Sequence, residues 1–153
     1  MPTEKVIRDA QEQPGDRGLE GHISLGAGMV NSDLKNTYGS VRVPFSGHEL
    51  DTGMTFFGSI IADHVKTGIG QTLPTGASIG FASMVACSRL LPNFVPSFTW
   101  LTDDGRTDAD PNRLLATARK VMQRREVTCT EAEAGLFHEI ARRARQYEPG
   151  QPS

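Results

Sequence analysis

Small and branched residues recur at every sixth position through the middle of the chain. Counted from Phe57, five hexads follow one another without a gap to residue 86. Glycine or alanine fills the second position in four of them, and the fifth position holds Ile61, Thr67, Leu73, Ile79 and Val85. This period matches neither an α-helix nor an amphipathic strand, which repeat every ~3.6 and ~2 residues. It suits a chain that turns a corner every sixth residue, so that three faces complete one triangular coil.

The hexads also predict which side chains fill such a coil. We expect the first and fifth positions to point inward and the small second residue to occupy the sharp turn. Stacked coils would pair through parallel ladders about 4.8 Å apart. Two more hexads begin at Leu19 and Leu25, and the segment 31–54 that follows them is less regular. The predicted fold is therefore mainly β, a parallel β-helix of hexapeptide repeats over 19–100 with a projecting loop at 31–54. The alternative is a Gly-rich antiparallel domain with an accidental register.

The two ends of the chain do not continue the repeat. Residues 1–18 are polar and have no apolar period, so we expect a disordered lead-in. For 101–153 we expect a tail with a pair of α-helices. Asp110-Pro111 supplies an N-cap and a first-turn proline for a helix to about residue 125. Thr130 and Glu133 form a capping-box signature for a second helix to about residue 146.

Composition narrows the classes of function. The 153 residues include 16 Lys plus Arg and 18 Asp plus Glu, which give a formal net charge of −2. No global positive field would attract nucleic acid or a membrane surface. The chain lacks a membrane-spanning apolar run and a secretory signal, and Cys87 and Cys129 join no zinc-ligand cluster. We therefore expect a cytoplasmic protein with no metal, nucleic-acid partner or membrane anchor.

Several motifs resemble a known family. They are Leu25-Gly-Ala-Gly28, Asn31-Ser-Asp-Leu-Lys-Asn36, Asp63-His64 and the run from Asn93 to Phe98 with Trp100. Over about 19–140 the chain resembles sugar nucleotidyltransferases fused to a C-terminal hexapeptide-repeat acyltransferase. An example is the bifunctional N-acetylglucosamine-1-phosphate uridyltransferase and glucosamine-1-phosphate acetyltransferase. The resemblance implies a left-handed β-helix that forms a homotrimer, binds acetyl-CoA between neighbouring subunits and serves UDP-N-acetylglucosamine biosynthesis.

The resemblance also implies candidate site residues. The family's acetyl-CoA contacts fall on Ser59 and Ala77, which are one coil of 18 residues apart. The segment 31–54 corresponds to a loop that reaches toward a sugar-phosphate acceptor. Its candidate phosphate and hydroxyl ligands, together with a lysine of a later hexad, are Lys35, Asn36, Tyr38, Arg42 and Lys66. As plain chemistry, an exposed polar loop is more often a solvated surface than a site.

The family's catalytic histidine is missing from its expected place. The position of the general base that deprotonates the acceptor amine falls on Ala10. His64 is the remaining catalytic candidate, as the base of a rearranged site, and a structural histidine is the alternative. We expect its side chain to be displayed outward and paired with Asp63 or Lys66, and we interpret His22 as a turn residue.

Two functions therefore stay open. The first is a sugar-phosphate N-acetyltransferase-like module, truncated and weakly active or inactive. The second is a non-catalytic trimerisation module that docks a nucleotidyltransferase partner. No Gly-rich segment for a nucleotide phosphate is present, so nucleotidyl transfer by this chain is not expected. Metal-assisted chemistry of the carbonic anhydrase kind would need three converging histidines, and the four in the chain lack a matching spacing. The patterns determine neither the acyl donor nor the acceptor sugar.

Overall fold

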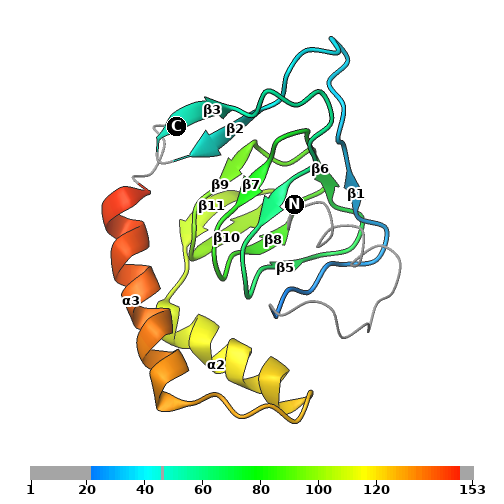
Figure 1. The fold of residues 1–153 in the computed structure, drawn as a ribbon. Helices are drawn as coiled ribbons and strands as arrows, with labels where there is room; N and C mark the ends of the chain where they lie inside the picture. Colours follow the sequence, from blue (N-terminus) through cyan, green and yellow to red (C-terminus); the bar gives the residue numbers. More distant parts are fainter. Residues whose placement is uncertain (1–21, 46, 149–153) are drawn as a thin grey trace.

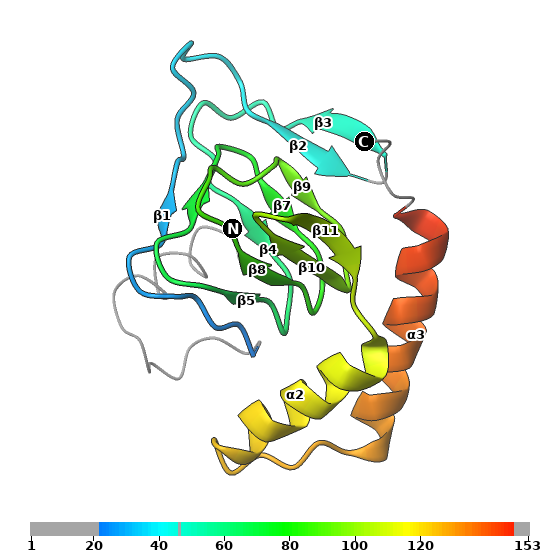
Figure 2. The same ribbon diagram turned by 180° about the vertical axis from the view of Figure 1, so that it is seen from behind.

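The computed structural model describes residues 22–45 and 47–148. Within them, strands gathered in small sheets dominate, one helix lies along a side of the strands, and a second lies below them in the view (Figures 1 and 2). The lead-in expected at 1–18 and the start of the hexad at Leu19 lie outside the described residues.

Successive short parallel strands belong in turn to three different sheets. The first sheet contains β4 (Ile60–Ile61), β7 (Ser78–Ile79) and β9 (Phe94–Val95). The second contains β5 (Lys66–Thr67), β8 (Met84–Ala86), β10 (Thr99–Thr102) and β11 (Gly105–Asp108). The third pairs β1 (Val30–Asn31) with β6 (Thr72–Leu73).

The register of these sheets follows the hexads. Ile60 lies beside Ser78, and Lys66 lies beside Met84, so the paired residues are 18 positions, or three hexads, apart. The next pairs join Ser78 to Phe94 and Met84 to Trp100, 16 positions apart, because the Pro-containing segment shortens the last turn. The parallel pairing at the predicted spacing is confirmed.

The second position of the hexads forms the corners. His64, Gly70, Gly76 and Ala82 all have positive φ angles, between 55° and 75°. Glycine adopts this left-handed conformation most readily, which explains why small residues recur there. At Gly76 a Cβ atom would lie 2.4 Å from the carbonyl oxygen of Arg42, so even alanine does not fit. His64 is the one large polar side chain in this set.

The predicted set of interior positions is partly wrong. Leu73, Ile79 and Val85 at the fifth position are buried as expected, but Ile69 at the first position is 79% exposed. The third position is the second interior site. Its residues, each at most 2% exposed, are Ser59, Val65, Gln71, Ala77 and Ser83. In extended backbone the third and fifth residues point to the same side, whereas the first residue already begins the corner.

The segment 31–54, expected as a projecting loop, contains a hairpin. β2 (Arg42–Phe45) pairs antiparallel with β3 (His48–Asp51). β1 precedes this hairpin and pairs with β6, which is 42 positions later in the chain. Val41 is fully buried, and its Cγ1 atom lies against the corner at Gly76. The hairpin therefore contacts the stacked strands, whereas the stretch between β1 and β2 projects (Figure 1).

The two helices confirm the predicted caps. α2 (Pro111–Gln123) begins after Asp110, whose side chain accepts a hydrogen bond from the Asn112 N–H, and α3 (Glu131–Tyr147) begins with the capping box of Thr130 and Glu133. The strands continue past the boundary expected at residue 100, because β11 folds back antiparallel on β10. Neither helix is long and apolar enough to cross a membrane, and these are the helices of the described residues.

The helices bury their apolar faces on the outside of the strands. Leu115 of α2 and Phe137 of α3 share one buried cluster with Ala82 and Phe98. A second cluster, with Leu73 and Ile79 among its members, fills the inside of the stacked strands. Leu136 of α3, by contrast, is exposed.

Candidate functional site

The His64 side chain points outward from the strands, as expected, but α3 covers it, so it is not displayed on the surface. Its ring centroid is 5.3 Å from that of His22, 5.4 Å from that of Phe81 and 5.6 Å from that of Phe137. The imidazole therefore contacts another imidazole, and the expected pairing with Asp63 or Lys66 is not what the structure shows. The Nδ1 atoms of His22 and His64 are both buried and have no hydrogen-bond partner within the described part of the chain.

The contact between the two histidines follows from the stacking. Ser24 bridges to Lys66 and Val30 pairs with Thr72, and each of these pairs is 42 positions apart. His22 and His64 have the same separation, so His22 occupies the equivalent corner one turn earlier. The hairpin-containing segment hides this equivalence in the sequence, which is why His22 was interpreted only as a turn residue. A gapped hexad alignment across 31–54 would have identified it.

The surroundings of His64 keep its ring neutral. Burial, the neighbouring His22 and the charge of Lys66 lower the pKa of His64 from 6.5 to about 4, although Asp63 and Glu133 act in the opposite direction. A neutral imidazole can accept a proton, but a pKa far below 7 makes it a weak general base at neutral pH. His64 can therefore accept a hydrogen bond through an uncharged ring nitrogen, but it is not a strong base at neutral pH.

A cavity of about 230 Å³ opens beside the two histidines. Its apolar walls come from the strand corner and from both helices, and include Phe81, Leu115, Met122 and Phe137. The polar groups on its lining are His22, Asp63, His64, Cys129 and Glu133. Among the residues that the structure describes, no three His, Cys, Asp or Glu side chains are arranged to hold a metal ion. The cavity therefore suits a small, largely apolar group with one or two polar atoms.

Lys66 lies close to His64 but contacts its backbone. The Nζ atom donates a hydrogen bond to the His64 carbonyl oxygen at 3.2 Å, and burial, followed by the charge of Arg125, lowers the pKa of the lysine. The charge of this half-buried ammonium helps to lower the pKa of the His64 imidazole.

The other acceptor candidates lie elsewhere. Lys35 donates to the Ser40 carbonyl oxygen at 2.8 Å, and the Tyr38 N–H donates to the Lys35 carbonyl at 2.9 Å, which closes a turn on which Asn36 and Tyr38 are exposed. Both views place the segment between β1 and β2 at the top of the molecule and β5 at the lower edge of the strands, above α2 (Figures 1 and 2). Within one chain, the structure does not bring Lys35, Asn36 and Tyr38 together with His64 and Lys66.

Ser59 and Ala77 occupy adjacent turns, one position before the paired residues Ile60 and Ser78. Both side chains point into the stack and are almost completely buried. The Ser59 hydroxyl donates to the Asn31 side-chain oxygen, and the Ala77 carbonyl accepts from the Ile60 N–H at 2.8 Å. Contact of these two residues with acetyl-CoA stays a prediction. The outward positions beside them are Ile60 and Ser78.

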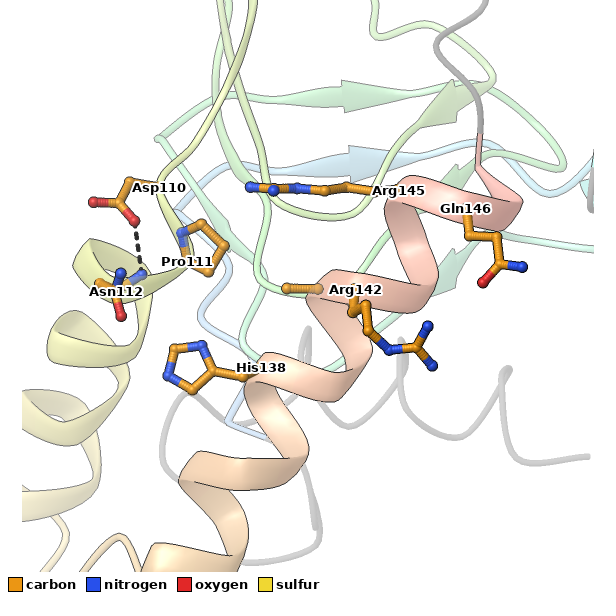
Figure 3. A pocket seen from close by; sticks show the side chains of 8 residues that line it. Asp110, Pro111, Asn112, His138, Arg142, Arg145 and Gln146 are labelled. Atoms are coloured by element: carbon orange, nitrogen blue, oxygen red, sulfur yellow. Dashed lines mark hydrogen bonds between the residues drawn. The ribbon is translucent and has the colours of Figure 1, made fainter.

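A larger, open pocket of about 630 Å³ lies between α3 and the start of α2. Figure 3 shows His138 and Arg145 extending from α3 toward α2, whereas Arg142 points away. Arg142 forms an ion pair with Glu139 at 2.8 Å. The Asp110 carboxylate already bonds the Asn112 N–H at the start of α2, where an anion would bind. The contacts of Arg142 and Asp110 therefore do not support a second binding site in this pocket.

Comparison with known proteins gives a partial match. No family model matches the chain. The chain is 30% identical over 97 residues to a bifunctional sugar-1-phosphate nucleotidylyltransferase/acetyltransferase of Sulfurisphaera tokodaii, a match that covers 60% of this chain. The match covers only 23% of the relative, so this chain spans less than a quarter of that protein's length. The comparison supports, in part, the resemblance to sugar nucleotidyltransferases that carry an acetyltransferase part.

Proposed function

We propose that this chain is a sugar-related, acyltransferase-like module built on a left-handed parallel β-helix with a C-terminal pair of helices. The observation that carries the proposal is the rotation of short parallel strands among three sheets at an 18-residue spacing. The partial match to a protein named as an acetyltransferase supports the same scaffold. The proposed donor is acetyl-CoA, and the proposed acceptor is an amino sugar phosphate.

The proposed site is shared between copies in a homotrimer. Lys35, Asn36 and Tyr38 belong to the segment between β1 and β2, which projects from the molecule, whereas Lys66 is on β5 (Figures 1 and 2), so a neighbouring copy would bring the two groups together. An apolar stripe supports self-association: Val30 and Leu90 both pair with Thr72 on one sheet, and the exposed Ile69 is at the start of the hexad that contains Thr72. Val30 and Leu90 are each 59% exposed. Covering this stripe with a second copy would remove apolar surface from water.

The proposed reaction is transfer of an acetyl group to an amine. The amine nitrogen forms a bond to the acetyl carbon, the carbon–sulfur bond breaks, and the sulfur leaves as the thiol of coenzyme A after accepting a proton. His64 would take the amine proton through its neutral imidazole. Because its pKa is about 4, we expect the unassisted rate to be low.

The second candidate is a non-catalytic assembly module for a nucleotidyltransferase partner. The observation in its favour is that His64 is enclosed by His22, Phe81 and Phe137, an environment that suits packing as well as catalysis. In this case the trimer forms through the apolar stripe, but acetyl-CoA does not bind. The two candidates therefore differ in one measurable property.

Acetyl-CoA titration by calorimetry, with light scattering in the same buffer, tests both candidates. Saturable binding to a trimer, lost in Ser78→Trp and kept in Thr107→Trp, would support the acyltransferase-like module. Ser78 lies outward beside Ala77, whereas Thr107 is exposed on β11, away from the proposed groove. A trimer without binding would leave only the assembly module, and a monomer at micromolar concentration would contradict both.

A further inference from the structure

The attachment of α3 to the strands depends on one aromatic cluster. The ring of Phe137 lies 5.1 Å from Phe81, 5.4 Å from Phe98 and 5.6 Å from His64, measured between centroids. The interplanar angles of 66° to 86° are those of edge-to-face contacts, which aromatic rings favour. His64 thus takes the place of a fourth aromatic ring beneath α3. Its contribution to this cluster depends on the imidazole staying uncharged.

Protonation would change this contact in two ways. A proton added to either imidazole would place a charge beside another imidazole only 5.3 Å away. It would also leave both ring nitrogens as donors, although the buried Nδ1 atoms already lack a partner within the described residues. A buried donor or charge without a partner is unfavourable. A protonated imidazole is therefore incompatible with the packing of these rings beneath α3.

The other charged groups around the pair do not remove this conflict. Attraction comes from Asp63, at the same corner, and from Glu133, at the start of α3, but Glu133 is held by the capping box. Repulsion comes from Lys66 on β5, which Arg125 faces from the end of α2, and from His22 itself. Cys129, in the link between the helices, also lines the adjoining cavity. Burial dominates the balance, which favours the neutral imidazole.

The opposite end of α3 is attached separately. The Glu148 carboxylate accepts hydrogen bonds from the Ser97 N–H at 2.7 Å and the Ser97 hydroxyl at 3.0 Å. The cavity of about 230 Å³ lies at the histidine end, where water could enter beside the rings. Release at the histidines would therefore begin at the junction of the two helices and leave the strands in place.

We propose that His64, packed against His22, forms an acid-sensitive latch that holds the α2–α3 helix pair against the strands and releases it when His64 is protonated. The inference does not rest on the proposed acetyl transfer. The folded pKa of His64 is about 4, and the ordinary value is 6.5, so the unfolded or released state binds more protons. Docking is therefore complete above about pH 6.5 and is lost as the pH falls toward about 4.

Amide hydrogen exchange followed by mass spectrometry tests the latch in the full chain. Exchange is measured between pH 7.5 and 4.5 and corrected for the intrinsic pH dependence of amide exchange. We expect protection in 111–147 to fall by at least about tenfold, the effect of roughly one pKa unit, while 60–102 stays protected. If 111–147 keeps its protection at pH 4.5, or if strands and helices lose it together, the latch is contradicted.

Variants separate the histidines from general acid denaturation. His64→Gly is suited to the corner, because Gly70 and Gly76 adopt the same left-handed conformation. We expect this variant to abolish the pH step in 111–147, and His48→Gln, at an exposed histidine on β3, to leave it unchanged. If His64→Gly leaves α2 and α3 undocked at pH 7.5, the variant His22→Phe serves instead. It keeps a ring in place and should reduce the pH-dependent loss of protection in 111–147. The proposal would be overturned if His22→Phe, and His64→Gly where its helices stay docked, lost protection in 111–147 at low pH as much as the unmodified chain does.

Discussion

The corners at Gly76 and His64 have the same backbone conformation and opposite roles. Both residues are second in their hexads and have positive φ angles, 75° and 60°. At Gly76 the corner is filled from outside by backbone, because the Arg42 carbonyl and Val41 approach it closely. At His64 the side chain reaches outward and joins the layer of helices. A regular repeat thus permits either close backbone packing or a side chain that connects to the next layer.

The largest effect is expected from adding a methyl group at the closed corner. Gly76→Ala combines a left-handed φ with a Cβ only 2.4 Å from the Arg42 oxygen, so we expect a loss of about 2 to 4 kcal/mol in the free energy of unfolding. Gly70→Ala is the matched control, because its φ is 66° and nothing lies within 4 Å. It should cost about 1 kcal/mol. Equal losses in urea titrations would show that the hairpin contact contributes nothing.

The next prediction compares Phe81 and Ile69, each of which precedes a corner residue. Phe81 is covered by the helices, whereas Ile69 is exposed in the single chain. We expect Phe81→Ala to lower the free energy of unfolding by roughly 2 to 3 kcal/mol, less than a fully buried Phe because Phe81 is half-buried. Ile69→Ala should change it by less than about 0.5 kcal/mol at a monomeric concentration. Ile69→Ala should instead weaken self-association in light scattering, and an unchanged oligomeric state would argue against the apolar stripe.

A pH titration sharpens the contrast at the histidine corner. The folded pKa of His64 lies below its ordinary value, so its contribution to stability is complete above about pH 6.5 and is lost toward about pH 4. The melting temperature should therefore fall over this range and fall less in His64→Gly. Nuclear magnetic resonance of the His64 ring protons should show a titration near pH 4. A midpoint close to 6.5 would mean that the ring is not enclosed in solution.

The smallest effect is expected at the far end of α3. Glu148→Gln weakens the two hydrogen bonds to Ser97 without removing the side chain, and we expect a loss of about 0.5 to 1.5 kcal/mol. Exchange of the last amides of α3 should rise, while that near residue 137 should not. If both ends of the helix respond equally, α3 detaches as one unit and the histidine end has no separate opening.

The hexads predicted the strand spacing and the corners, and separate capping motifs predicted the starts of the helices, because each depends on local sequence. They did not predict which positions face inward: a period of six sets the repeat length, but the phase depends on which residue begins the corner. Ile69 was therefore assigned to the interior although it is exposed, and the third position, which Ala77 occupies, was not recognised as an interior position. The same limit applies to the candidate site.

The contact between His22 and His64 could not be inferred from an ungapped repeat. The hairpin-containing segment separates the two histidines by 42 positions, and only the pairing of β1 with β6 shows that they are equivalent. The cavity beside them also requires Leu115 and Phe137, whose docking depends on the path of the chain through β11. Contacts between layers are decided by that path, which the local pattern does not contain.

The reversal of the chain at β11 also affects how molecules can join end to end. A stack of parallel strands presents unpaired backbone groups at its last turn, and such an edge can recruit a strand from another molecule. Here β11 runs antiparallel along β10 and places exposed Arg106, Thr107 and Asp108 at that edge. Charged side chains on an edge strand discourage further strand addition. The edge of the sheet β5-β8-β10-β11 is therefore protected against growth into a fibre.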